Sequence, residues 1–246
     1  MNLFLILASL FCIGSLTGWI LEVFYRRFFS SVNPERKWIN PGFCTGPYLP
    51  LYGSGLCVLY LLASLESASV ISDPFWNKTV LFLCMAAAMT LIEYGTGLYC
   101  LKVAHVRLWD YRSQWGNIQG IICPKFSFYW ALIGAAYYFL IHPRILRGLE
   151  WLSQNLAFSF FIGMFFGIFL IDAVQSAQLV AKLRKFAVEN EVIVRYEAIK
   201  LHIRETHEKN REKIHFFFPF RSDHSLLEHL REMRPTLELH VKKKNK

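Results

Sequence analysis

Charged residues are scarce in this chain of 246 residues. Asp, Glu, Lys and Arg together make up 18% of it, below the roughly 25% that is usual in soluble domains. Hydrophobic residues make up 54% and aromatic residues 16%, and the mean hydropathy is +0.30. These shares argue against an ordinary soluble domain and indicate a membrane protein with several spans.

Several motifs that would indicate a particular chemistry are also missing. None of the six cysteines forms a CxxC pair, and we interpret them as packing residues rather than disulfide or metal ligands. No GxxxxGK[ST] stretch occurs, so the chain has no phosphate-binding loop of that type. No nucleophile–base pair and no set of metal ligands is apparent. We therefore expect no cofactor and no metal, and we lean against an enzyme without excluding one.

Five apolar stretches are long enough to cross a membrane. A spanning helix needs about 20 mostly apolar residues, because lipid offers its backbone no hydrogen-bond partners. We therefore predict an all-α bundle of about five spans. The stretches cover roughly residues 3–25, 48–66, 79–101, 126–143 and 156–178.

The basic residues predict how the bundle is oriented. Lys and Arg cluster after the first span, between the third and fourth spans, and after the fifth span. Because positive residues concentrate on the cytoplasmic side, we expect a protein of the cell membrane with an outside N-terminus and a cytoplasmic tail. Residues 1–178 would form the bundle, with structured cytoplasmic loops at 26–47 (loop one) and 102–125 (loop two). Residues 179–246 would form the basic tail.

The net charge of +9 does not indicate a nucleic-acid partner. The tail from residue 179 onward holds 16 Lys and Arg against 10 Asp and Glu, and no base-reading module accompanies this charge. Positive residues beside spans are normally contacts to anionic lipid headgroups. We expect such lipids as partners, together with a second copy of the chain or another membrane subunit.

The tail has the pattern of an amphipathic helix. Apolar residues recur at spacings of three and four from Leu183 to Ile203, which predicts a helix that continues the fifth span. Ser225 and Glu228 suit a capping box for a last short helix. Six histidines have irregular spacings, which we interpret as a solvated tail rather than a metal site. They are His202, His207, His215, His224, His229 and His240.

Three acids lie inside the predicted spans, namely Glu22, Glu93 and Asp172. A carboxylate costs a few kcal/mol or more in hydrocarbon, so each needs a partner, water or a function. Glu22 is shallow, and Arg26 lies one helical turn beyond it as an ion-pair candidate. Glu93 lies roughly 13 Å from the expected cytoplasmic boundary, and it is our strongest candidate.

Small residues accompany two of these acids. Gly14 and Gly18 share a helix face with Glu22, which favours close packing against a neighbouring helix. Gly163 and Gly167 lie roughly opposite Asp172 on the fifth span. We therefore expect the fifth span to contact two neighbours.

The loops supply polar residues that could reach the same level of the membrane. Residues 40–55 are rich in proline and glycine, which suits a re-entrant turn. Residues 105–130 mix aromatic and basic side chains with Asp110 and Asn117. We predict a cytoplasm-facing polar cavity that the loops and spans line together. Its candidate residues are Glu22, Arg26, Glu93, Tyr94, Arg107, Asp110, Tyr111, Asn117 and Asp172.

Several motifs resemble those of a known membrane family. They are GWxxExxYR (18–26), GFxxGPxxPxYGxG (42–55), EYxxG (93–97), WDYR (109–112) and NIxGxIC (117–123) with SxxW (127–130). In this order they resemble the ABC-transporter type IV family, also called CmpB-like, over about residues 14–178. The resemblance implies a multi-pass membrane protein of transporter type. It also implies that the motif residues, among them Tyr52, Tyr94 and Trp109, are family signature positions. The arginine expected near Ile121 is missing, which argues against a fixed phosphate or carboxylate clamp there.

Three functions are consistent with these patterns. The first is a transporter or permease whose acids and loop arginines line a path for a small or amphiphilic solute. The second is an accessory or scaffold subunit that docks through its tail helix. The third is a lipid-modifying enzyme at the cytoplasmic interface, with Glu93 or Asp110 as general base and Arg26, Arg107 or Arg112 holding a headgroup.

Overall fold

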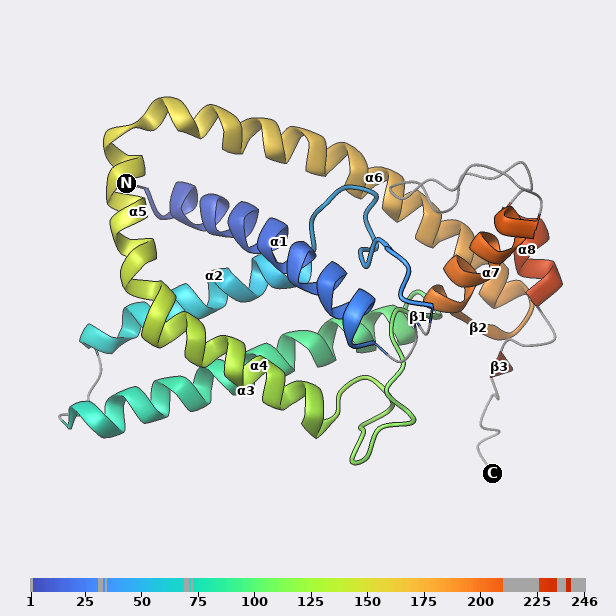
Figure 1. Ribbon diagram of the computed structural model, residues 1–246, viewed down its shortest axis with the longest axis horizontal. Coiled ribbons are helices and arrows are strands. Elements are labelled where there is room, and N and C mark those ends of the chain that lie inside the picture. The colour runs from blue at the N-terminus through green and yellow to red at the C-terminus, as the bar shows by residue number, and fades with distance from the viewer. Residues whose placement is uncertain are drawn as a thin grey trace.

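The computed structural model describes residues 2–30, 33, 35–68, 71, 73–209, 226–233 and 238–239. This part of the chain forms a bundle of α-helices, which confirms the predicted fold class (Figure 1). The long helices run side by side along the longest axis, and α7, α8 and a small sheet gather at one end. The helices are α1 (Leu3–Phe28), α2 (Pro50–Ser64), α3 (Pro74–Lys102), α4 (Pro124–Ala136), α5 (His142–Gln154), α6 (Ser159–Glu189), α7 (Tyr196–Lys209) and α8 (Leu226–Met233).

Three of the described helices, α1, α3 and α6, are long and apolar enough to cross a membrane. The predicted second span corresponds to α2, an apolar helix of 15 residues. The predicted fourth span falls on α4 and a π-helical turn, Tyr137–Ile141, which leads directly into α5. A membrane bundle is therefore established, whereas the count of five spans stays a prediction.

Local sequence signals determine where the helices begin. The side chain of Asn2 accepts a hydrogen bond from the amide of Phe4 at the start of α1. Asp73 caps α3 in the same way and accepts from the amides of Phe75 and Trp76. Proline occupies the first turn of α2, α3 and α4, where its missing N–H costs nothing.

The helices α1 and α2 pack closely through glycines. A Cβ atom added at Gly18 would overlap the ring of Tyr52, and one added at Gly53 would overlap the Ser15 hydroxyl. This close approach is what small residues allow between membrane helices. The predicted small-residue face on the first span is confirmed.

Within the described chain, the second neighbour expected on the glycine face of α6 is not present. A Cβ atom added at Gly163 or Gly167 would meet no atom within 4 Å. The packed face of α6 contacts α1, where Phe11 lies against Phe166 and Phe169. The glycine face of α6 therefore has no packed neighbour among the described residues.

The predicted tail helix is also wrong in its middle part. The helix α6 ends at Glu189, and Glu191 adopts a left-handed backbone conformation with φ of 53°. The chain then forms strand β2 (Val192–Arg195) before α7 begins. Strand β2 pairs in parallel with β1 (Val106–Arg107) from loop two and antiparallel with β3 (Glu238–Leu239). The β-branched run Val192–Val194 favours a strand over a helix at this point.

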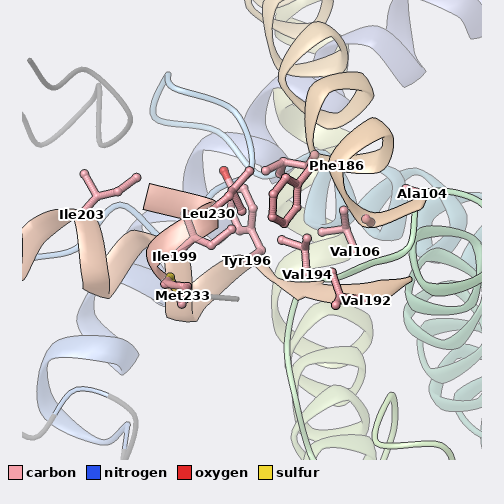
Figure 2. Close-up of a cluster of buried hydrophobic side chains, with 12 residues drawn as sticks. Ala104, Val106, Phe186, Val192, Val194, Tyr196, Ile199, Ile203, Leu230 and Met233 are labelled. Atoms are coloured by element: carbon pink, nitrogen blue, oxygen red, sulfur yellow. The ribbon is translucent and has the colours of Figure 1, made fainter. Parts of the chain in front are cut away.

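The apolar residues of the tail are buried against the rest of the chain. Figure 2 shows a cluster in which β1, β2, α6, α7 and α8 all contribute side chains. Leu183, Val194, Ile199 and Leu230 are fully buried in it. The apolar spacing therefore marks a real buried face, and the chain reversal at 190–191 directs that face onto loop two. The predicted cap residue Ser225 lies outside the described residues.

Candidate functional site

Glu93 lies at the centre of a polar cluster between the helices. It projects from α3 and is only 3% exposed. The indole Nε1 of Trp130 in α4 donates to Oε2 of Glu93 at 3.0 Å. The Tyr111 hydroxyl of loop two donates to Oε1 at 3.2 Å. Both donors are neutral, so neither brings a positive charge to this buried carboxylate.

Glu22 reaches the same cluster from α1. The hydroxyl of Tyr52 in α2 donates to Oε2 of Glu22 at 3.1 Å. The ring of Tyr52 packs on the ring of Trp130, with centroids 5.0 Å apart. Tyr52 and Trp130 therefore connect the two acids that the sequence predicts as a site. We call Glu22, Tyr52, Glu93, Tyr111 and Trp130 the carboxylate cluster.

Arg26 lies beside the carboxylate cluster and is shared by two acids. Its Nε donates to Oε1 of Glu22 at 3.0 Å, as the spacing of four residues predicts. Its Nη1 donates to Glu197 of α7. One guanidinium thus faces two carboxylates. Glu22 also keeps 23% of its side chain exposed, so it is the more accessible of the two acids in the cluster.

Loop two is folded onto α3 and orients Tyr111. The Tyr111 ring stacks on Phe126 at 4.2 Å between centroids and 9° between planes. Burial and the nearby Glu93 raise the pKa of Tyr111 well above its usual value, so its hydroxyl is a hydrogen-bond donor at neutral pH. Trp109 donates from Nε1 to the Ile121 carbonyl at 2.8 Å, which joins the two ends of loop two.

Asp172 lies outside the carboxylate cluster and holds loop one. The amides of Thr45 and Gly46 donate to it at 3.1 and 2.7 Å. The hydroxyls of Thr45 and Tyr48 also donate to it, as does Ser176 at 3.2 Å. These donors use the roughly four acceptor positions of one carboxylate. Asp172 therefore anchors the loop to α6, with no capacity left for a further donor in this conformation.

Asp110 connects loop two to the tail. It forms ion pairs with Arg112 at 2.6 Å and with Arg195 of β2 at 3.2 Å. Burial raises the pKa of Asp110, but the hydrogen bonds from Arg112 outweigh burial and hold this pKa below its usual value. Asp110 is therefore a structural contact of the loop and is separate from Glu93.

The remaining predicted residues lie in or beside loop two. Asn117 accepts from the amide of Gly120 at 3.0 Å and donates to the carbonyl of Gln114 at 2.9 Å. Arg107 is buried and donates to the Gln119 carbonyl at 3.0 Å. Tyr94 is half-buried beside Glu93 in α3. Asn117 and Arg107 therefore stabilise the loop that positions Tyr111.

Three residues of this arrangement were not predicted as site residues. Tyr52 and Trp130 stand in the motifs that resemble the family, so their positions were visible, but their link to the acids was not. Glu197 lies in the tail, beyond the resemblance, and no sequence signal connects it to Arg26. These contacts join positions far apart in the chain.

Lys200 of α7 lies at the same end of the bundle and holds loop one. Its Nζ donates to the carbonyls of Asn40 and Gly42 at 3.2 and 2.5 Å. Burial, followed by the neighbouring Arg26, lowers the pKa of Lys200 to about 7. The tail thus contacts α1 through Glu197 and loop one through Lys200.

An apolar groove of about 500 Å³ lies on a different side of α1. It is lined by Trp19, Ile20, Val23, Phe24 and Trp38. None of these side chains belongs to the carboxylate cluster. The groove is therefore separate from the polar path that the sequence predicts.

Together, the long apolar helices and the acids buried between the helices define a polytopic membrane protein. Residues 9–177 match the sequence profile of a family described as "putative ABC-transporter type IV". The chain belongs to this family, as the motifs suggested. Searches of curated proteins and of solved structures gave no match.

Proposed function

We propose that this transporter-like protein is a permease whose carboxylate cluster binds a small cationic solute or a proton. One observation carries the proposal. Glu93 is 3% exposed inside a membrane helix, and the two hydrogen bonds that it accepts come from neutral donors. An acid at such depth is a functional-site candidate by default. A cation that enters the cluster would supply the charge that these donors lack.

The two acids suggest an order of contact for the solute. Glu22 is the more exposed acid, and Glu93 is the deeper one. Tyr52 bonds to Glu22 and packs on Trp130, which bonds to Glu93. In our proposal the solute meets Glu22 from the cytoplasmic side and reaches Glu93 when the Tyr52 and Trp130 contacts open. Because Tyr111 of loop two bonds to Glu93, this opening would also change the contact between loop two and α3.

An accessory role is the second candidate, and the open face of α6 favours it. Gly163 and Gly167 leave a face with no packed neighbour among the described helices, which a second copy or another membrane subunit could cover. The lipid-modifying enzyme receives less support, because Asp110 and Arg112 bond to each other. Contact of the basic loops with anionic lipid headgroups stays part of our proposal.

Flux measurements on reconstituted protein test the permease. The full chain would be placed in liposomes that contain a pH-sensitive dye, and a panel of labelled small cations would be added outside. We compare wild type with Glu93→Gln, which keeps the shape and removes the charge. Glu189→Gln is the matched control, because its side chain is 60% exposed at the end of α6. Thermal unfolding shows whether each variant folds.

A permease of this kind should lose flux only in the cluster variant. We expect Glu93→Gln to reduce proton or cation flux at least about tenfold, the ratio that 1.4 kcal/mol of binding energy represents. Glu189→Gln should behave as wild type. Equal flux in both variants would overturn the proposal. Wild-type liposomes that are tight to the whole panel would favour the accessory role.

A further inference from the structure

The helices α7 and α8 bring two histidines and a glutamate together. His202 comes from α7, whereas His229 and Glu232 come from α8, one turn apart. Their ligand atoms all lie within 4.8 Å of one another. Nε2 of His202 is 3.1 Å from Oε2 of Glu232. The rings of His202 and His229 meet edge to face, with centroids 5.5 Å apart.

This set has the chemistry of a transition-metal site. Two imidazole nitrogens and one carboxylate oxygen form a ligand set that binds zinc and leaves a fourth position open. At zinc bond lengths of about 2.0–2.2 Å, tetrahedral ligand atoms lie roughly 3.3–3.6 Å apart. The side chain of Glu232 is 60% exposed, so it can rotate to close the remaining gap. We propose that His202, His229 and Glu232 bind a divalent transition metal of the zinc class.

The surroundings of the three residues suit such an ion. His229 is 2% exposed and precedes the fully buried Leu230, so its ring is held in place by the apolar cluster. His202 is partly exposed, with 28% of its side chain accessible. The proposed metal would have apolar packing on one side and an open ligand position toward solvent. An apolar shell around a metal limits solvent access and tunes its bound water.

The consequence of binding would be structural. A metal that bridges α7 and α8 would stabilise their pairing, because it binds the folded arrangement and not the unfolded chain. The histidine spacing in the sequence does not indicate this site, because its ligands come together only when α7 packs against α8. The interpretation of the tail as merely solvated does not hold for His229.

Metal titration of the full chain tests the site. The protein would be purified through a tag without histidine and titrated with Co²⁺ and Zn²⁺. His202→Gln and Glu232→Gln are the test variants, since an amide can keep the hydrogen bond between the helices while it binds metal poorly. His105→Asn is the control, because His105 has φ of 53° and asparagine tolerates that conformation. His229→Gln is avoided because the site is buried.

We expect one tight site, with the intense visible bands of four-coordinate cobalt. Each test variant removes a direct metal ligand and should weaken metal binding by more than about tenfold. Removal of a group that only hydrogen-bonds to a ligand already costs about tenfold or more. His105→Asn should bind as wild type does. Zinc should slow hydrogen exchange in α8 of the wild type and not in His202→Gln.

Three results would overturn the inference. Unchanged affinity in both test variants would place the metal on other histidines or cysteines. A weak six-coordinate cobalt spectrum would indicate an adventitious ion only. No binding at all would leave a hydrogen-bonded contact between α7 and α8.

Discussion

At the residue scale, the two most deeply buried acids of the bundle differ in how many hydrogen bonds they accept. Asp172 accepts hydrogen bonds from two backbone amides and three hydroxyls, which is how a structural carboxylate is normally satisfied. Glu93 accepts from two neutral side chains. This difference, rather than depth alone, separates an anchor from a candidate binding site.

The anchor role of Asp172 leads to a stability prediction. In Asp172→Asn one oxygen becomes an NH₂ group, which turns a donor toward the amide of Thr45 or toward the amide of Gly46, depending on which oxygen is replaced. We expect a loss of about 1.5–3 kcal/mol in unfolding free energy, as for a lost hydrogen bond to a charged group. Thermal unfolding in detergent and hydrogen exchange at Thr45 and Gly46 measure it. Glu189→Gln serves as control, and slow exchange at both Thr45 and Gly46 in the variant would contradict the prediction.

Asp110 leads to a prediction about pH. Its pKa in the folded protein lies below the usual value, so the carboxylate stabilises the folded state above its unfolded pKa of about 3.9. This contribution is lost as the pH falls through the lower folded pKa. We expect the amide of Val194, which donates to the carbonyl of His105 at 3.0 Å, to exchange faster below about pH 4.

The matched variant isolates the cause of this change. Asp110→Asn should show faster exchange at Val194 already at neutral pH, and no further step on acidification. Rates are corrected for the intrinsic pH dependence of exchange. A step of the same size in the variant would assign the change to another group.

At the scale of elements, glycine distinguishes a packed helix face from an open one. Gly18 in α1 faces Tyr52 directly, whereas Gly167 in α6 has nothing within 4 Å of an added Cβ. Both lie in apolar helices long enough to span a membrane. The same substitution should therefore have different effects at the two positions.

Leucine substitutions test this contrast. Gly18→Leu should lower the stability by about 1–3 kcal/mol, the usual cost of overpacking, because Tyr52 and α2 must move. Gly167→Leu should change it by less than about 0.5 kcal/mol, as at exposed positions. Thermal unfolding of both variants in the same detergent decides the point. Equal losses would mean that α6 has a neighbour on its glycine face.

At the scale of the whole molecule, the described part of the tail packs against the helix bundle. Glu197 bonds to Arg26 of α1, and Lys200 bonds to carbonyls of loop one. Because Arg26 also bonds to Glu22, the tail is one contact away from the carboxylate cluster. A change in the cluster could therefore reach the tail through Arg26.

Loss of Glu197 should loosen the tail. In Glu197→Gln the guanidinium of Arg26 keeps one carboxylate partner, so we expect α7 to open more readily by about 1–3 kcal/mol, between the values for exposed and buried ion pairs. Hydrogen exchange in α7, with α3 as internal reference, measures this opening. Glu205→Gln is the matched control, because Glu205 is exposed on the same helix. Equal protection in both variants would show that the apolar cluster and Lys200 hold the tail without Glu197.

Several features of the fold follow from the sequence, because a helix in lipid must be apolar over its length and must satisfy its own backbone hydrogen bonds. Apolar length determined the helices α1, α3 and α6, and the four-residue spacing of Glu22 and Arg26 determined their ion pair. The glycine pattern of α1 determined its close packing on α2. Each of these features depends on residues within a few turns of one helix, so periodicity is sufficient to predict them.

The remaining features depend on where the chain reverses, which periodicity does not encode. Tertiary structure alone placed Tyr52 and Trp130 between Glu22 and Glu93, and it assigned Asp172 to loop one. It also broke the tail helix at Glu191. That reversal brings β2 to loop two, and the apolar cluster that it builds packs α8 against α7, which sets His229 beside His202. Contacts between distant segments form only when these segments pack together, and this packing decides which polar residues become a site.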